Sequence, residues 1–317
     1  MLGSVTSLLG GPDEFQTALS NEGSISLFTT TCGQFRARLT RVELHRLRLS
    51  AIDEHLPRIG FLAVPTDMVL VSFPIGDQPG PMWGGIRPSR SEFMTFGPGH
   101  RVHMRTQGPC RWGAIWFPAR ELAGYFHDLT EVALAIPSVA QTWRPPAAPG
   151  RRLLQFHGAA IRAAEARPET IINAEAAHGM EQQLIEALVE CLSAGVSNEE
   201  TATRHRHRAI VARFEEFLRS EPYPDLRTQN ISAAIGVSDR LLRICCKEEL
   251  GMSPISYVRL RALHRVHSIL RSSDSRTTSV SQIARRHGLR DLGRFAVIYR
   301  SLFGELPSAT LRRNQRM

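Results

Sequence analysis

The sequence is poor in cysteine, in lysine and in long apolar runs, and each scarcity excludes a class of protein. The cysteines are odd in number, scattered and never spaced as C-x-x-C, which indicates neither a disulfide framework nor a zinc site; they are Cys32, Cys110, Cys191, Cys245 and Cys246. No apolar run reaches the roughly 18 residues of a membrane-spanning helix, and the first residues, MLGSVTSLLGGPDE, lack the basic segment of a secretory signal. We therefore expect a cytoplasmic protein with free thiols, no metal or other cofactor, and no membrane partner.

Lysine is almost absent, but arginine is abundant and unevenly distributed. Lys247 is the only lysine among the 39 Lys and Arg residues, a bias typical of codon usage, so arginine content alone indicates little. Residues 204–317 hold 22 Lys and Arg against 10 Asp and Glu, a net charge of +12, whereas residues 1–203 hold 17 against 20, a net charge of −3. This asymmetry favours nucleic-acid binding by the C-terminal part, with an affinity that falls steeply with salt.

Residues 231–251, ISAAIGVSDRLLRICCKEELG, have the pattern of a helix-turn-helix. Gly236 can adopt the positive φ of a sharp turn, and Ser238 is placed to cap the second helix. The second helix carries three basic residues on one predicted face, namely Arg240, Arg243 and Lys247. Leu242 and Cys246 point the other way, which predicts a cationic outer face and makes Cys246 a core residue rather than a redox sensor.

The same spacing occurs a second time, 52 residues further on. Residues 283–288, IARRHG, repeat the Ile-small-x-x-x-Gly spacing of residues 231–236, and another amphipathic helix is predicted after them. Between the two copies lies an amphipathic stretch entered through Ser253 and Pro254. Its helix of about 16 residues would span roughly 24 Å, enough to hold two recognition helices at a fixed separation.

Residues 204–313 resemble the DNA-binding domain of the AraC/XylS family of bacterial transcription regulators. The matching residues are Gly236, Val237, Ser238, Leu242, Leu250, Gly251, Met252, Ser253, Pro254, Tyr257, Arg261, Ile283, Ala284, Gly288, Phe295, Phe303, Gly304, Pro307, Ser308 and Arg312. The resemblance implies two helix-turn-helix units joined by a central helix, each placing its second helix in the major groove of double-stranded DNA. It also implies a transcription activator that works with RNA polymerase, associates with the nucleoid and forms a homodimer, with a small-molecule effector as a further partner.

The resemblance also assigns the residues that face DNA. The first recognition helix would present Ser238, Arg240, Arg243 and Lys247. The second would present Arg290, Asp291, Gly293, Arg294 and Arg300. Ile244 stands where the family usually has arginine, and Val297 stands where a polar or basic residue is common.

Between about Gln34 and Phe117 the pattern has a period of two residues, which is typical of half-buried strands. Predicted strands include residues 35–40, 46–49, 59–64, 68–73, 93–96, 101–105 and 112–116, separated by Pro- and Gly-rich turns. Many short strands favour a small barrel or sandwich, and the resemblance implies a cupin-like β-barrel sensor domain with helices. The fold class is therefore α+β, with an all-α C-terminal domain.

A metal enzyme of the cupin type would need a cluster of metal ligands, which this region lacks. His100 and His103 are three residues apart and would face opposite sides of a strand, so we expect both to be surface or turn histidines. The aromatic residues Trp83, Trp112, Trp116 and Phe117 are expected in the core rather than in a ligand cage. No catalytic residue and no enzyme activity are predicted.

Two helices are expected after a break at residues 143–150, WRPPAAPG. The second carries a wide apolar stripe that includes Leu184, Leu188 and Leu192, and the sequence leaves packing against the β domain and a dimer seam equally open. The predicted domains are a regulatory and dimerisation domain at residues 1–195, a linker at 196–207 and the DNA-binding domain at 208–317. A further helix is expected to begin near residue 205 and to end at Pro222 and Pro224.

Three function classes fit the sequence to different degrees. The favoured one is a sequence-specific DNA-binding regulator whose activity is set by the N-terminal domain. A protein-binding module would use the helical domain to contact another protein, without sequence preference for DNA. A cupin-type enzyme with an appended regulator domain would bind stoichiometric metal, which the missing ligand cluster argues against.

Overall fold

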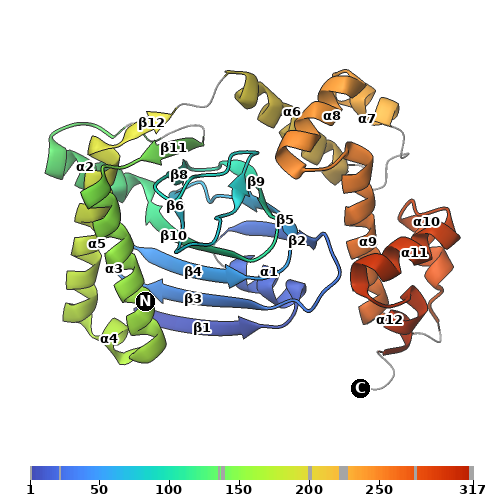
Figure 1. Cartoon of the computed structure of the whole chain (residues 1–317), viewed down its shortest axis with the longest axis horizontal. Coiled ribbons are helices and arrows are strands. Elements are labelled where there is room, and N and C mark those ends of the chain that lie inside the picture. The colour runs from blue at the N-terminus through green and yellow to red at the C-terminus, as the bar shows by residue number, and fades with distance from the viewer. Residues whose placement is uncertain are drawn as a thin grey trace.

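The computed structural model describes residues 2–20, 23–134, 136, 140–198, 202–220, 228–274 and 277–313. A β-rich part occupies the centre, the long helices α3 (Ala147–Ala166) and α5 (Ala174–Ala194) lie on one side of it, and the helices α6 to α12, within residues 202–313, lie on the other (Figure 1). Among the described residues, no helix is both long and apolar enough to cross a membrane.

The larger sheet has eight strands in the order β1-β3-β4-β10-β6-β8-β11-β12. In chain order they are β1 (Gly3–Leu9), β3 (Ala37–Glu43), β4 (Arg48–Glu54), β6 (Met68–Pro74), β8 (Phe93–Phe96), β10 (Cys110–Pro118), β11 (Gln141–Arg144) and β12 (Val196–Asn198). The neighbouring pairs β1–β3, β3–β4, β4–β10 and β10–β6 are antiparallel, so one face of the sheet can be covered while the other meets a second layer.

The smaller sheet has four strands in the order β2-β5-β9-β7. They are β2 (Ser24–Thr29), β5 (Arg58–Ala63), β7 (Met82–Trp83) and β9 (Arg101–Thr106). The β-rich N-terminal architecture is confirmed, but the strands form two separate ladders and not one closed barrel. A core between the ladders buries Trp83, Trp112 and Trp116, as expected, together with Phe15 and Leu19 of helix α1 (Pro12–Ser20).

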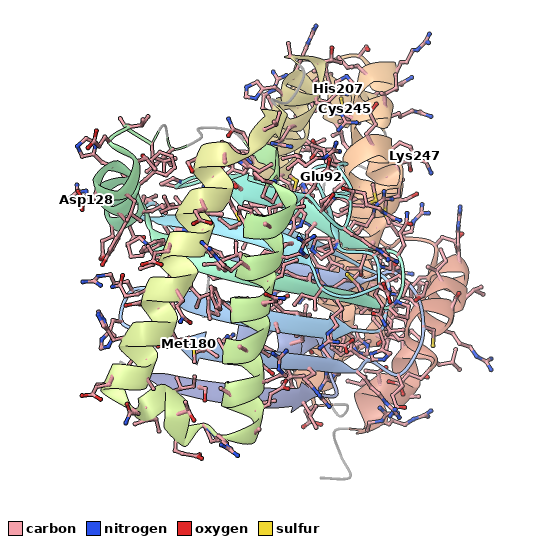
Figure 2. The ribbon with its side chains drawn as sticks, turned by 60° about the vertical axis from the view of Figure 1, so that its left-hand side comes forward. Glu92, Asp128, Met180, His207, Cys245 and Lys247 are labelled. Atoms are coloured by element: carbon pink, nitrogen blue, oxygen red, sulfur yellow. The ribbon has the colours of Figure 1, made fainter. Side chains whose placement is uncertain are left out.

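Helices cover the outer face of the larger sheet. They are α2 (Ala119–Thr130), α3 (Ala147–Ala166), α4 (Glu169–Ile172) and α5 (Ala174–Ala194). Helix α3 packs on β3 and β4, and α5 runs beside α3 (Figure 2). The apolar stripe of α5, including Leu184 and Leu188, is buried within the single chain, so packing and not a dimer seam accounts for it.

Regular structure covers most of the segment that the prolines were expected to break, except Pro145 and Pro146. Strand β11 includes Trp143 and Arg144, and α3 begins at Ala147, with Pro149 and Gly150 in its first turn. The predicted break is present at Pro145 and Pro146 but is shorter than the expected stretch of residues 143–150. A proline in the first turn of a helix costs no hydrogen bond, because the N–H groups there have no partner within the helix.

Among the described residues of the C-terminal part, every regular element is a helix. Its elements are α6 (Ala202–Ser220), α7 (Thr228–Ala234), α8 (Asp239–Leu250), α9 (Pro254–Ser272), α10 (Val280–Arg286), α11 (Leu292–Phe303) and α12 (Pro307–Arg313). Between the two parts, β12 pairs with β11 and α6 starts at Ala202, while Pro222 and Pro224 lie outside the described residues. The core of this part includes Phe214, Leu242, Tyr257, Val266 and Tyr299, and it continues onto Ile59 of the smaller sheet.

Candidate DNA-binding interface

Helices α7 and α8 form the first helix-turn-helix. The turn passes through Gly236 at φ 69°, and the Val237 N–H donates to the Ser232 carbonyl at 3.0 Å. Ser238 begins α8 as its cap, with its side chain accepting from the Leu241 N–H at 3.2 Å. The hydroxyl of Ser232 also donates to the Asp239 carboxylate, which ties the end of α7 to the start of α8. The predicted turn and cap are confirmed.

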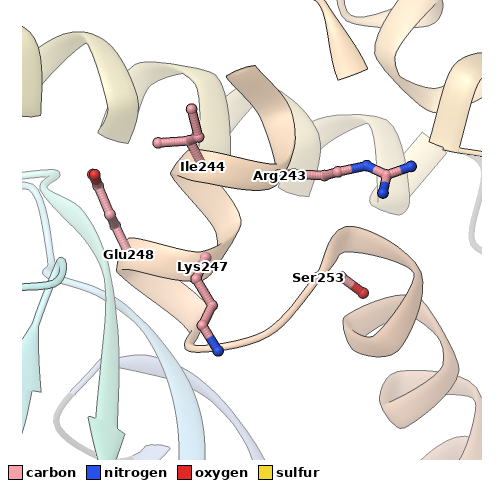
Figure 3. A pocket seen from close by; sticks show the side chains of 5 residues that line it. All are labelled: Arg243, Ile244, Lys247, Glu248 and Ser253. Atoms are coloured by element: carbon pink, nitrogen blue, oxygen red, sulfur yellow. The ribbon is translucent and has the colours of Figure 1, made fainter. Parts of the chain in front are cut away.

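Helix α8 has one buried face and one exposed face, as the spacing predicted. Leu242, Cys245 and Cys246 are fully buried beneath it. The basic residues on its exposed side are Arg240, Arg243 and Lys247. Figure 3 shows Arg243 and Lys247 directed away from the helix axis beside Ser253, the cap of α9. Cations on this side can reach phosphates or base edges without uncovering the core.

Helices α10 and α11 form the second helix-turn-helix, whose turn differs in length from that of the first. Gly288 has φ 76°, and the Leu289 N–H donates to the Ala284 carbonyl at 2.9 Å. The cap of α11 is Asp291, whose carboxylate accepts from the Arg294 N–H at 2.9 Å. The turn glycines are 52 residues apart but the caps Ser238 and Asp291 are 53 apart, so the second turn is one residue longer. Arg290 occupies that extra position, in the turn and not in the helix.

The two recognition helices lie at opposite ends of α9, as Figure 1 shows. This helix has 19 residues, which corresponds to a length of roughly 28 Å. Its cap Ser253 accepts from the Ser256 N–H at 3.2 Å, and Pro254 fills the first helical position. The exposed residues of the second unit include the predicted DNA-facing set Arg290, Asp291, Gly293, Arg294 and Arg300. The nine predicted residues therefore fall into two surface groups, one at each end of α9.

The C-terminal region matches a family model described as a helix-turn-helix domain over residues 231–313. The chain is 31% identical over 124 residues to XylDLEGF operon transcriptional activator 2 of Pseudomonas putida, a match that covers 39% of this chain and 77% of that protein. The chain belongs to the AraC/XylS family.

Other relatives match over a similar length of the chain. The XylDLEGF operon transcriptional activator of Pseudomonas putida is 31% identical over 125 residues, which is 39% of this chain and 38% of that protein. The match thus spans less than two fifths of the length of this longer relative. Among solved structures, the AraC-like transcriptional activator CuxR is 15% identical, with 84% of this chain and 94% of that chain covered and a TM-score of 0.44.

The AraC/XylS-type domain is joined to the smaller sheet by a buried cluster of polar side chains around Glu215 of α6. Its oxygen Oε1 accepts from the Tyr257 hydroxyl at 2.6 Å and lies 2.9 Å from His103 Nε2. Its other oxygen accepts from Arg261. Since a carboxylate can only accept, Nε2 of His103 carries the proton. Strand β9, α6 and α9 therefore meet at one carboxylate, and we call these four residues the Glu215 cluster.

The electrostatics of the Glu215 cluster keep its carboxylate ionised. Burial by itself would raise the pKa of Glu215, but the hydrogen bond and charge of His103, with further contributions from Arg261 and Tyr257, outweigh burial and lower the pKa to about 2 from 4.5. Burial raises the pKa of the Tyr257 hydroxyl, which holds its proton for the hydrogen bond. A second carboxylate, Glu249 at the end of α8, lies 4.0 Å from His103 Nδ1.

The sequence-based prediction for His103 was wrong. His103 is only 3% exposed, because the face of β9 opposite to Val102 and Met104 packs against the DNA-binding domain. His100 is half-buried and its ring lies 5.7 Å from that of Phe96. A detectable signal for the cluster was Glu215 itself, since an acid on the apolar face shared by Val211 and Leu218 interrupts the pattern of α6.

The two adjacent cysteines of α8 are both core residues. Burial raises the pKa of the Cys245 thiol to about 11 and raises that of Cys246 further. Because the thiolate is the reactive form, both side chains stay protonated and inert at neutral pH. Their position in the core agrees with a packing role and not with redox sensing.

Proposed function

We propose that this protein is a transcription activator that binds a specific DNA sequence through α8 and α11. The observation that carries the proposal is the duplicated, capped recognition helix with exposed cations, present at both ends of α9. One rigid connecting helix lets both units occupy successive major-groove segments of a single duplex.

Readout divides between bases and phosphates. Arginine can donate two parallel hydrogen bonds to guanine O6 and N7, so Arg240 and Arg243 of α8 and Arg294 of α11 are suited to base edges. Lys247 and Arg300 lie in the last turns of their helices, and Arg290 precedes α11. We assign these three cations to phosphates, where they fix register without reading sequence.

The N-terminal region would set activity through the Glu215 cluster. Its four residues come from β9, α6 and α9, so any change in the position of β9 alters the support of the DNA-binding domain. His264 of α9 adds a second connection, with Nε2 lying 2.8 Å from the Thr29 carbonyl of β2. We therefore propose that the N-terminal region changes the activity of the DNA-binding domain through the contacts of the smaller sheet.

Three partners extend the proposal. Relatives named as transcriptional activators support contact with RNA polymerase. A small-molecule effector would act on the N-terminal region. A homodimer would require a surface other than the buried stripe of α5. The exposed apolar residues that could form it are Leu129, Val132 and Val196. Sedimentation of the full chain measures whether the dimer forms.

The test is selection of duplexes from a random pool by the full-length chain, followed by affinity measurement. We expect enrichment of one sequence with two recognition segments about one helical turn apart. Arg240→Ala should then weaken binding to the recovered duplex by about 1 to 3 kcal/mol. The control Arg120→Ala removes the same charge from exposed α2 and should leave affinity unchanged. Failure to enrich any sequence would contradict the proposal and favour a protein-binding module.

A further inference from the structure

Two exposed aliphatic side chains occupy the same position in the two recognition helices. Ile244 lies six residues after the cap Ser238 and is 39% exposed, and Val297 lies six residues after the cap Asp291 and is 71% exposed. Single exposed apolar residues are ordinary on protein surfaces. Their recurrence at one equivalent position, on the two helices assigned to the same task, is not explained by folding, because neither side chain is needed to fill the core.

Cations outnumber acids around both residues. Residues three and four apart on a helix are surface neighbours. Ile244 thus lies between Arg240 and Lys247, and Val297 lies between Arg294 and Arg300. The one exposed acid among these neighbours, Glu248, lies four residues after Ile244 and is hydrogen-bonded to His207 at 2.7 Å. Ile244 also lines a surface hollow, together with Arg243, Lys247, Glu248 and Ser253 (Figure 3). An aliphatic group framed by cations matches a polyanionic surface that carries isolated apolar groups.

The major groove of DNA is such a surface. Thymine presents a C5-methyl group there, and side chains without hydrogen-bonding groups recognise it by apolar contact. The flanking arginines and lysine would hold the phosphates and guanine edges on either side. Valine and isoleucine have few rotamers, so little conformational entropy is lost when the contact forms.

We propose that Ile244 and Val297 are specificity-determining residues that each contact a thymine methyl group, one in each recognition segment. The proposal rests on the proposed DNA-binding function of α8 and α11 and adds the base that each position reads. A contact with another protein is the alternative for these side chains, and the experiment distinguishes the two.

The experiment uses the full-length chain and the duplex recovered by selection. Each thymine is replaced in turn by uracil, which keeps every hydrogen-bonding group and removes only the methyl group. We expect one uracil substitution in each recognition segment to weaken binding about fourfold, the equivalent of about 0.8 kcal/mol for one buried methyl-sized group. Ile244→Ala and Val297→Ala are measured on both duplexes.

The decisive result is the coupling between side chain and methyl group. Ile244→Ala should weaken binding to the thymine duplex and have no further effect on the duplex with uracil in the first segment; Val297→Ala should behave likewise in the second. Ile172→Ala and Val5→Ala remove matched exposed side chains of the N-terminal region and should change neither affinity.

Two results would overturn the inference while leaving the proposed function intact. Equal losses on thymine and uracil duplexes would mean that the side chains act through the helix and not through a methyl group. Unchanged affinity in both variants would assign the residues to a protein contact. If selection enriches no sequence at all, the proposed function fails and this inference fails with it.

Discussion

Helix α8 of the first helix-turn-helix packs against α6 and strand β9, whereas α11 of the second packs against α10 and α12 of its own unit. The first unit is therefore supported by the N-terminal region directly. The second is supported mainly through α9, where His267 stacks on Phe303 with ring centroids 4.0 Å apart and its Nδ1 lies 2.7 Å from the Tyr299 hydroxyl. The segment after β2 also lies beside the end of α11, at Cys32.

Because of this difference, a structural change in the N-terminal region should affect the first helix-turn-helix more than the second. A shift of β9 acts on the first unit at the Glu215 cluster. The same shift reaches the second unit mainly by moving α9 as a rigid body, because α9 carries both Tyr257 and His267. The comparison predicts that the buried contacts near α6 dominate stability and coupling, and that the exposed cations of α11 affect DNA binding alone.

The largest expected effect follows from removing the central carboxylate. Glu215→Ala leaves Arg261, His103 and Tyr257 without their shared acceptor. Breaking a buried ion pair by removing one partner costs about 3 to 5 kcal/mol, so we expect the free energy of unfolding to fall by that amount. Denaturant unfolding of the full chain measures it.

The control for this prediction is the adjacent residue. Glu216 is exposed and pairs at the surface with Arg219 and Arg101. Glu216→Ala should change stability by no more than about 0.5 kcal/mol. Similar unfolding of the two variants would show that the Glu215 cluster does not join the domains, and the contrast between the two units would lose its basis.

Acid should weaken the connection between β2 and α9 through His264. Burial lowers the pKa of this imidazole to about 4 from 6.5. The unfolded chain therefore binds a proton that the folded chain excludes, so the stabilisation is complete above about pH 6.5 and is lost as the pH falls toward 4. The loss should approach about 3 kcal/mol.

The variant His264→Gln separates this contribution from the others. A glutamine amide can donate to the Thr29 carbonyl but does not titrate, so the stability of the variant should depend less on pH between 6.5 and 4. His157, whose pKa burial also lowers to about 4, titrates in both proteins and cancels in the difference. Parallel pH profiles for wild type and variant would exclude His264 as the group responsible.

Most of the DNA-binding domain could be predicted from the sequence because its signals are local. A turn glycine, a cap and an apolar period lie within about 20 residues of one another, and the structure has Gly236, Ser238 and Leu242 in those roles. Strands bounded by Pro- and Gly-rich turns were also found: Phe93–Phe96, which is buried at every position, has the predicted bounds.

The elements that were missed depend on contacts distant in sequence. Strand β1 has exposed residues such as Val5 and Leu8 and is defined by its pairing with β3. His103 is buried by a domain that begins about 100 residues later in the chain, and the local sequence around β9 does not predict that contact. The extra residue in the second turn, which places Arg290 before the cap Asp291, became visible only from the positions of both caps.

The two recognition helices should contribute comparably to DNA affinity despite their different supports. Arg243→Ala in the first and Arg300→Ala in the second should each weaken binding to the selected duplex by about 1 to 3 kcal/mol. The two losses should add in the double variant, since the sites lie at opposite ends of α9. Titration at several salt concentrations measures this, and a variant that loses a phosphate contact should also lower the salt slope by about one. An effect confined to Arg243 would mean that only the supported unit binds DNA.

The smallest expected effect is that of Gly293→Ala, which should change protein stability and DNA affinity in opposite directions. A Cβ at this position would meet only Asp291 Oδ1, at 3.7 Å, so the protein itself has room for alanine. Gly293→Ala should therefore raise stability by about 0.4 to 1 kcal/mol. At the equivalent position, α8 carries Arg240. If α11 approaches the DNA backbone closely at Gly293, the added methyl group should weaken DNA binding by about 1 kcal/mol.

Gly304 gives the matched contrast, because it ends α11 at φ 77° with Cys32 Sγ 3.0 Å from the site of a Cβ. Gly304→Ala should lower stability by about 1 to 2 kcal/mol, since alanine is strained in the left-handed region. Gly304 would then be required by the fold, and Gly293 by the close approach of DNA. A Gly293→Ala variant that is less stable, or that binds the selected duplex as well as wild type, would remove Gly293 from the DNA-facing residues.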